Sequence, residues 1–277
     1  MSTDILASFN VSAEPFSKEV DDRDLWLPPS KQGVLDELLD AIHARRSVLL
    51  TGEPGVGKTC LLRATRHALG TEEFRLTYCH NVTLGRRDFY RQLCVALGLP
   101  RGHYTAGDVF YAISTHVEEL AKERAFPVFL VDEAHLLHQD TLDHLHILLN
   151  YAWDSRALLS LVLIGLSELD DRLRLRRNRS LYSRLHHRLS IGPLSPEDTA
   201  DYVRTRLGRV GGSKDLFSPE ALALLHEAAQ GSLRDIDRLA TAALRLAARR
   251  KRKTIERDLL GRVLQSEHRD LPTGERP

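Results

Sequence analysis

The sequence predicts an α/β fold in which a parallel five-stranded sheet is flanked by helices and followed by a small all-helical lid domain. Short apolar runs alternate with helix-favouring segments up to about residue 191, which is typical of a parallel sheet covered on both faces. A glycine-rich turn joins the first run to a helix, and from residue 196 every patterned segment is helical. The expected strands are residues 47–51, 74–79, 127–131, 158–165 and 189–191.

The composition is that of a soluble globular protein. Of the 277 residues, 42% are hydrophobic and 28% are charged, and the net charge of +1 gives no overall preference for nucleic acid. Cys60, Cys79 and Cys94 have no paired spacing, which favours reduced thiols and a cytoplasmic location. Because no apolar run is long enough to span a bilayer and no signal peptide opens the chain, we expect no membrane partner.

The glycine-rich turn, GEPGVGKT at Gly52 to Thr59, matches the phosphate-binding pattern G-x-x-x-x-G-K-[ST]. The glycines let backbone N–H groups face a phosphate, and the N-terminus of the following helix adds its dipole. Lys58 is expected to reach the β- and γ-phosphates, and the Thr59 hydroxyl to hold Mg²⁺. The candidate nucleotide contacts are Gly52, Glu53, Pro54, Gly55, Val56, Gly57, Lys58, Thr59 and Cys60.

An acidic pair follows the third apolar run. Residues 127–131 suit a buried parallel strand and lead directly into Asp132 and Glu133. Asp132 is expected to hold Mg²⁺ through its water shell, and Glu133 to polarise the water that attacks the γ-phosphate. Two carboxylates at the end of a buried strand need such a role, because burying them unpaired is expensive. Together the two motifs predict a nucleoside triphosphatase that uses ATP and Mg²⁺.

We expect four parts along the chain. Residues 1–45 form an extended arm and a helix, capped by Ser30, that pack on the ATPase core. Residues 46–192 form the α/β nucleotide-binding domain, and residues 193–267 form the helical lid. Residues 268–277 are polar, contain two prolines and are expected to be a disordered tail.

At these residues the chain resembles AAA+ ATPases of the ExeA-like group and the related ATPase subunits of transposition systems (TnsC, TniB, MuB and IstB). The resemblance covers about residues 5–265 and implies the AAA+ version of the phosphate-loop fold. Besides the two motifs it rests on Glu14-Pro15-Phe16, Leu163-Ile164-Gly165 with Glu168-Leu169, Tyr182-Ser183-Arg184-Leu185, Gly192-Pro193-Leu194 and Gly231-Ser232-Leu233-Arg234.

The resemblance implies three further catalytic roles. Arg184 matches the arginine finger that reaches the γ-phosphate of a neighbouring subunit, with Arg188 as its competitor. Arg234 matches the lid arginine called sensor 2, although a surface arginine that pairs with a nearby aspartate fits the same position. Sensor 1 is usually polar, but Leu166 stands there in this chain. Ser167 is therefore the candidate, and slow hydrolysis would suit a timer or switch better than a motor.

The function implied by the resemblance is a transposition helper. Such ATPases assemble as homo-oligomeric rings or helical filaments on duplex DNA and recruit or regulate a transposase. One alternative is a cytoplasmic ExeA-like ATPase of secretion or envelope assembly, and another is a slowly hydrolysing, ATP-bound scaffold.

Non-specific DNA binding would need a basic surface, and three segments are candidates. Two of them are residues 172–179 and the pair Arg86 and Arg87. The third is the cluster Arg245, Arg249, Arg250, Lys251, Arg252 and Lys253. A cationic helix end is also favourable by itself through the helix dipole, so a purely structural role stays open for each segment.

Overall fold

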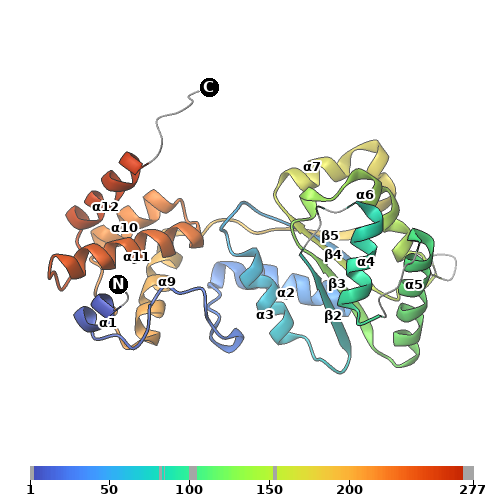
Figure 1. Cartoon of the computed structure of the whole chain (residues 1–277), viewed down its shortest axis with the longest axis horizontal. Helices are drawn as coiled ribbons and strands as arrows, with labels where there is room; N and C mark the ends of the chain where they lie inside the picture. The colour runs from blue at the N-terminus through green and yellow to red at the C-terminus, as the bar shows by residue number, and fades with distance from the viewer. Residues whose placement is uncertain (1–2, 81–82, 84, 100–104, 152–154, 271–277) are drawn as a thin grey trace. The chain divides into compact units, whose positions relative to one another are not determined.

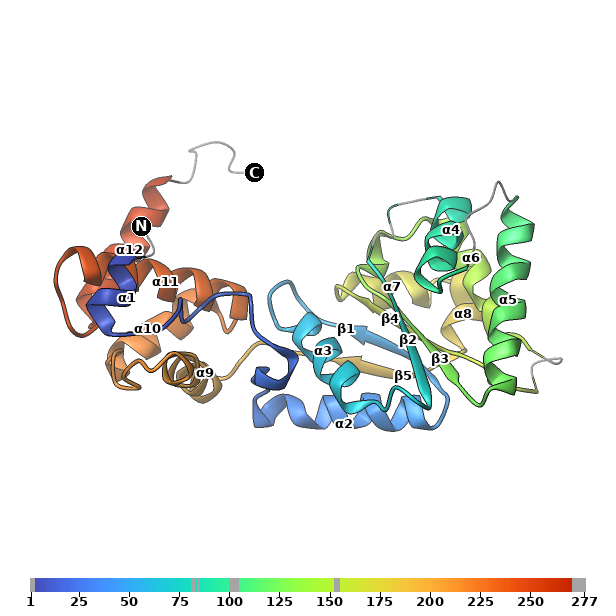
Figure 2. The same ribbon diagram turned by 60° about the horizontal axis from the view of Figure 1, so that its bottom comes forward.

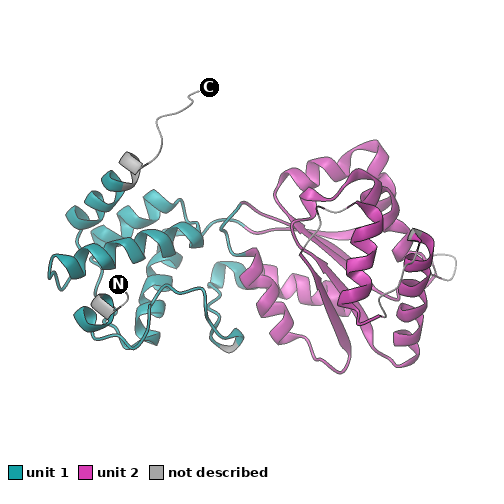
Figure 3. Cartoon of the chain, viewed as in Figure 1, with its two compact units in different colours: residues 1–32, 54–57, 192–277 teal, residues 33–53, 58–191 magenta. Residues whose placement is uncertain are grey.

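The computed structural model describes residues 3–80, 83, 85–99, 105–151 and 155–270. These residues divide into two compact units, which Figure 3 shows in different colours. Unit 1 comprises residues 1–32, 54–57 and 192–277, and unit 2 comprises residues 33–53 and 58–191. In the described part of the chain, no helix is both long and apolar enough to cross a membrane.

Unit 2 contains a parallel five-stranded sheet with the order β2-β3-β4-β1-β5 (Figure 1). Its central strands are buried along their whole length, which explains why they read as continuous apolar runs rather than as alternating ones. The strands are β1 (Ser47–Thr51), β2 (Phe74–Cys79), β3 (Phe126–Val131), β4 (Ser160–Gly165) and β5 (Leu185–Ser190).

Helices cover both faces of this sheet (Figures 1 and 2). On one face, Leu49, Phe129 and Leu163 belong to a core cluster that also contains residues of the helices from α4 to α8. Because side chains alternate along a strand, Leu50 and Leu130 point to the other face, which α2 and α3 cover. The elements are α2 (Pro29–His43), α3 (Lys58–Ala68), α4 (Arg86–Ala96), α5 (Ala106–Lys122), η2 (Ala134–Leu136), α6 (Gln139–Leu145), η3 (His146–Leu149), α7 (Glu168–Arg174), η4 (Arg176–Asn178) and α8 (Arg179–Tyr182).

Unit 1 is helical and has its own apolar core. Helices α9, α10 and α11 begin at serine caps, and Ser195 forms a capping box with Asp198 at the start of α9. The elements are α1 (Thr3–Phe9), η1 (Asp22–Asp24), α9 (Pro196–Arg209), α10 (Pro219–Ala229), α11 (Leu233–Arg249) and α12 (Arg257–Asp270).

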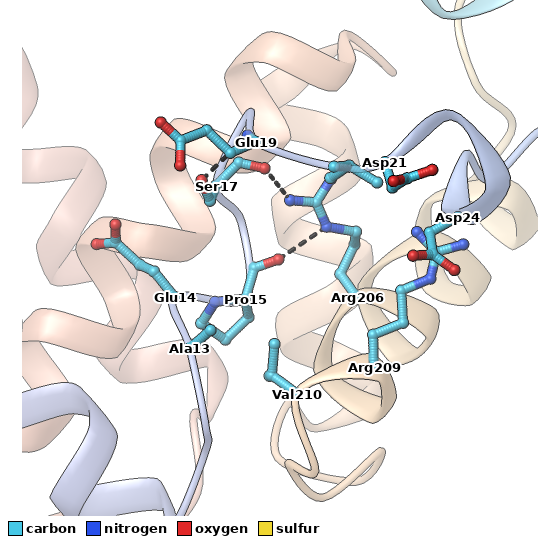
Figure 4. A pocket seen from close by; sticks show the side chains of 11 residues that line it. Ala13, Glu14, Pro15, Ser17, Glu19, Asp21, Asp24, Arg206, Arg209 and Val210 are labelled. Carbon is cyan, nitrogen blue, oxygen red and sulfur yellow. Dashed lines mark hydrogen bonds between the residues drawn. The ribbon is translucent and has the colours of Figure 1, made fainter.

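A buried arginine ties the N-terminal arm to α9 in unit 1. Arg206 donates from Nε to the Pro15 carbonyl at 2.7 Å, from Nη2 to the Ser17 carbonyl, and from Nη1 to the Tyr202 hydroxyl at 3.1 Å. Figure 4 shows this guanidinium beside a pocket of about 440 Å³ between the arm and α9. Phe16 packs edge-on against Phe217 at 6.4 Å, so it is a core residue of this unit.

The arm differs from the expectation. Residues Thr3–Phe9 are helical rather than extended, and Ile5 packs in the core of the C-terminal helices. Residues 1–32 group with those helices in unit 1, and the expected packing of residues 1–45 on the ATPase core stays a prediction. A seven-residue helix is too short to produce a clear periodic pattern in the sequence.

Other differences lie at the ends of elements. The last strand is β5, Leu185–Ser190, longer than the expected 189–191, because an edge strand with exposed His186 and Arg188 has no apolar run to mark it. Strand β4 begins two residues later than expected, at Ser160. Helix α12 continues through Asp270, and the rest of the expected tail, residues 271–277, lies outside the described residues.

Candidate nucleotide-binding site

The phosphate-loop sequence leaves the end of β1 in a conformation that needs glycine. Gly52 N–H donates to the Gly165 carbonyl at 3.1 Å, which fixes the start of the loop to the end of β4. Gly55 and Gly57 have φ values of 81° and 102°, in the region that side chains disfavour. The loop therefore has the open backbone that a phosphate cradle requires.

Lys58 begins α3 and is only 8% exposed. Its Nζ donates to the carbonyls of Gly52 at 2.7 Å and Glu53 at 3.1 Å. Both partners belong to the loop itself, so the ammonium group is held over the loop by contacts that a phosphate oxygen can replace. Thr59 is exposed in the first turn of α3, and Cys60 is half-buried beside it.

Asp132 follows β3, is nearly buried and accepts two hydrogen bonds. Its Oδ2 accepts from the Tyr78 hydroxyl at 2.7 Å, and its Oδ1 accepts from Glu133 N–H at 2.9 Å. Burial and the hydrogen bond to Asp132 both raise the pKa of Tyr78, so its hydroxyl stays protonated and donates. Tyr78 was absent from the sequence-based candidates; the only signal for it is its place near the end of β2, beside β3.

Glu133 is 49% exposed and has a left-handed φ of 54°, a strained conformation that directs the chain into η2. Its Oε2 lies 3.6 Å from His135 Nε2. On the other side of the ring, His135 Nδ1 lies 3.5 Å from Leu166 N. His135 therefore connects the acidic pair to the end of β4, a link that sequence reasoning missed.

The register of the sheet places these groups at one edge. Thr51 pairs with Gly165 between β1 and β4, and Val131 pairs with Leu163 between β3 and β4. The loop and the acidic pair therefore leave the same carboxyl edge, from strands about 10 Å apart across β4. Ser167 lies just past β4, and its hydroxyl donates to Glu53 Oε1 at 2.8 Å.

Arg184 lies at the opposite edge. It immediately precedes Leu185, which pairs with Ser47 at the start of β1. Its Nη1 donates to the Ser180 carbonyl at 3.1 Å. The pKa of His146 is lowered first by burial and second by the positive charge of Arg184. The competitor Arg188 lies in mid-strand, with its guanidinium 4.0 Å from the Tyr182 ring centre. Arg184 therefore lies at the edge of the sheet opposite to the one from which the phosphate loop leaves β1.

Arg234 belongs to unit 1 and is exposed in the first turn of α11. In this unit, Leu233 N–H donates to the Gly55 carbonyl at 2.9 Å, and a side chain at Gly55 would meet the Cβ of Arg234 at 3.3 Å. Among the described residues, Asp235 pairs with Arg238 at 3.1 Å, and Asp237 accepts from Tyr202 at 2.6 Å. The surface pairs expected for Arg234 are thus formed by other residues.

Lys31 is a further residue that the sequence did not indicate. It is 4% exposed, and its Nζ donates to the Val56 carbonyl in the tip of the phosphate loop. A Cβ at Gly57 would lie 3.8 Å from this Nζ. A buried lysine needs a partner, and this one contacts the backbone of the loop.

The residues fit a magnesium nucleotide. Gly55 and Gly57 have no space for a Cβ, which would clash with Ser232 Oγ at the first and meet Leu233 Cδ1 at 2.9 Å at the second, so only glycine fits the turn. The Lys58 ammonium group is held by the carbonyl of Gly52. Thr59 and Asp132 offer hydroxyl and carboxylate oxygens, the ligand type that Mg²⁺ prefers. In the described part of the chain, no group of three or more His, Cys, Asp or Glu side chains is arranged to hold a metal.

The strand order, the glycine loop after β1 and the acidic pair after β3 define a class: this is a P-loop AAA+ fold. Residues 41–173 match the family model described as an AAA domain. The chain is also 33% identical over 254 residues to General secretion pathway protein A of Aeromonas hydrophila. This match covers 91% of the chain but 46% of that protein, so the chain spans less than half the length of the relative.

Two solved structures share the fold. The Aeropyrum pernix ORC1 protein in complex with DNA superposes with a TM-score of 0.65 at 20% identity, over 92% of this chain and 69% of that one. Drosophila ORC bound to DNA superposes with a TM-score of 0.69 at 20% identity, over 96% of this chain and 66% of that one. At this identity, the likeness establishes the AAA+ architecture.

Proposed function

We propose that this protein is an oligomeric AAA+ ATPase that binds duplex DNA without sequence specificity and recruits or regulates a transposase. The observation that carries the ATPase part is the common carboxyl edge of β1, β3 and β4, where Lys58, Asp132 and Glu133 emerge. The narrower role, as a transposition helper, rests on the motif series of the sequence.

The proposed chemistry assigns one task to each residue. The loop backbone and Lys58 bind the phosphates, while Thr59 and Asp132 would hold Mg²⁺, which supplies positive charge to the phosphate oxygens. Glu133 accepts the proton of the attacking water, and its exposed carboxylate leaves room for that water. Ser167 is proposed as sensor 1 and Arg234 as sensor 2.

The oligomer follows from the position of Arg184. Because Arg184 immediately precedes β5, at the amino edge of the sheet, it is the proposed finger for the γ-phosphate of a neighbouring copy. This supports a homo-oligomer, as a ring or a helical filament. In the described part of the chain, Cys60, Cys79 and Cys94 form no disulfide, which supports the proposed cytoplasmic location.

Retention of duplex DNA on a filter, with and without ATP, tests the proposal. We expect ATP to increase retention at roughly 0.1 M salt, because assembly multiplies weak phosphate contacts. Lys58→Ala should bind DNA equally with and without ATP and should release no phosphate. If ATP leaves DNA retention by the unaltered protein unchanged, the DNA-dependent role is wrong. The ATPase part of the proposal is tested separately, by phosphate release.

A second candidate is an ATPase of secretion or envelope assembly. The observation that favours it is the 33% identity to a general secretion pathway protein over most of this chain. The same filter assay separates the two, since ATP-stimulated DNA retention is expected only for the first. A third reading, an ATP-bound scaffold, predicts nucleotide binding with no phosphate release.

A further inference from the structure

Five consecutive cations connect α11 to α12 in unit 1. These residues, which we call the basic turn, are Arg249, Arg250, Lys251, Arg252 and Lys253. All five are exposed. A helix C-terminus favours one or two positive charges in its last turn, so the helix dipole does not account for a run of five. Their mutual repulsion calls for a counter-charge.

The described part of the protein does not supply that counter-charge. Among the residues that the structure describes, the five side chains of the basic turn form no ion pair and no hydrogen bond. The neighbouring Arg245 differs, because it donates to Glu14 Oε1 of the arm at 3.2 Å. The acidic residues close in sequence, Glu256 and Asp258, are exposed around the start of α12.

In the other basic segment of comparable size, Arg172, Arg174 and Arg177 are engaged internally, whereas Arg176 and Arg179 are exposed. Arg172 donates to the His135 carbonyl at 2.9 Å, and burial lowers its pKa. Arg174 pairs with Asp170 at 2.6 Å, and Arg177 pairs with Asp143 at 3.0 Å. Arg86 is likewise in contact with His144. The geometry thus separates basic residues that hold unit 2 together from the basic turn.

The backbone of the basic turn is fixed at both ends. Arg252 N–H donates to the Ala247 carbonyl at 3.0 Å, and Lys251 has the left-handed φ of 53° that commonly ends a helix. Downstream, Ile255 is fully buried and bridges Phe217, and its carbonyl accepts from Ser218 N–H at 2.9 Å. Presenting five charges on an ordered turn costs less entropy on binding than presenting them on a flexible tail.

We propose that the basic turn is the surface by which this protein contacts the sugar-phosphate backbone of duplex DNA. The inference deepens the proposed function and rests on its DNA-binding part. Five residues span at most about 17 Å, which corresponds to about half a turn of a duplex that carries one charge per 1.7 Å. Since the basic turn has only Lys and Arg side chains and no aromatic residue, contacts to phosphates rather than to bases are expected.

Two variants with equal loss of charge test the assignment. The first replaces Arg250, Lys251, Arg252 and Lys253 by Gln, and the control replaces Arg174, Arg176, Arg177 and Arg179 by Gln. The readout is affinity for a duplex of arbitrary sequence, in the presence of ATP, as a function of salt. Each phosphate contact contributes about 0.9 to the slope of log K against log salt. With four contacts removed, we expect the magnitude of the slope to fall by about 3.6 in the turn variant and by less than about 1 in the control.

The outcomes are distinguishable. If the unaltered protein shows no DNA affinity, the proposed function fails and the inference with it. If it binds DNA but the turn variant keeps the full slope, the inference alone is overturned. Should the fourfold variant unfold, the single change Lys253→Gln decides: it should lower the slope by about 1 and leave the melting temperature unchanged.

Binding to vesicles that contain phosphatidylserine is measured in parallel. A turn variant that loses only vesicle binding would assign the basic turn to anionic lipid and overturn the DNA assignment.

Discussion

Charged side chains are buried in two regions of this molecule, and their partners differ in kind. At the carboxyl edge of the sheet, Lys58 donates to carbonyls only six and five residues away in the chain. In unit 1, Arg206 donates to carbonyls 191 and 189 residues away. Local partners can be exchanged for a ligand without unfolding the protein, whereas distant partners hold segments of the fold together. The separation in sequence thus distinguishes a binding group from a structural one.

The largest effect is expected at the sheet edge. Glu133→Gln should lower the rate of ATP hydrolysis by about 10²–10³-fold, because the amide cannot accept the proton of the attacking water. The melting temperature and ATP affinity should stay close to those of the unaltered protein, since Glu133 is half exposed. Phosphate release and fluorescent-nucleotide binding measure the two. Equal losses of ATP binding and turnover would mean that Glu133 is not the base. They would also weaken the contrast between the sheet edge, as a site of ligand binding, and the structural contacts of unit 1.

Arg206→Ala should have a structural effect instead. Removing the guanidinium leaves two arm carbonyls and the Tyr202 hydroxyl without their donor, which is expected to lower the free energy of unfolding by about 3 kcal/mol. The control is Arg204→Ala in the same helix, whose exposed pair with Asp201 should contribute less than about 1 kcal/mol. Urea denaturation measures both. Equal stability of the two variants would contradict a structural role for Arg206.

The same network should give unit 1 a pH dependence. Burial raises the pKa of Asp237 from 3.8 to about 6, against the opposing effects of Tyr202 and Arg206. A carboxyl with a raised folded-state pKa contributes stability below pH 3.8 that is lost as the pH rises through about 6. At about 1.36 kcal/mol per pKa unit, the loss is about 2–3 kcal/mol.

Asp237→Asn removes this titration while keeping an oxygen for the Tyr202 hydroxyl. Between about pH 4 and 6.5, the unaltered protein should therefore lose stability relative to the variant. Urea denaturation across this range measures the difference. Parallel stability curves for the two proteins would show that Asp237 does not titrate there.

The smallest effect concerns the support of Asp132. Tyr78→Phe removes the hydroxyl that donates to Asp132 Oδ2, and should raise the Mg²⁺ concentration for half-maximal ATPase activity by roughly tenfold. Tyr111→Phe is the control, because Tyr111 is 73% exposed. An unchanged Mg²⁺ requirement in Tyr78→Phe would mean that the sheet edge tolerates loss of this contact.

The sequence was most informative where strands are buried on both faces. Strands β1, β3 and β4 are fully buried, so each is visible in the sequence as a continuous apolar run. The two motifs that follow β1 and β3 predict the edge of the sheet where the candidate site lies. Helix α1 was missed entirely, and only the end of strand β5 was predicted. An edge strand and a single short helix produce little hydrophobic periodicity in the sequence.

Residues that act through contacts across the fold were also missed. Tyr78 and His135 reach the acidic pair from other elements, and Lys31 reaches the loop from the start of α2. Tyr78 and Lys31 have no sequence motif, because each is defined by what the fold brings beside it. His135 follows the acidic pair in the sequence, but its contact with Leu166 depends on the position of β4. The grouping of residues 1–32 with the C-terminal helices depends on contacts more than 180 residues apart, such as those of Arg206.

The place of Arg184 has one more consequence. It stands at the start of β5, separated from its own cradle by the length of a strand, about 20 Å, which exceeds the reach of an arginine side chain. If Arg184 is the arginine finger, as proposed, a single copy in dilute solution would bind ATP without hydrolysing it. We expect specific activity to climb with protein concentration, so that turnover begins only where enough copies have gathered.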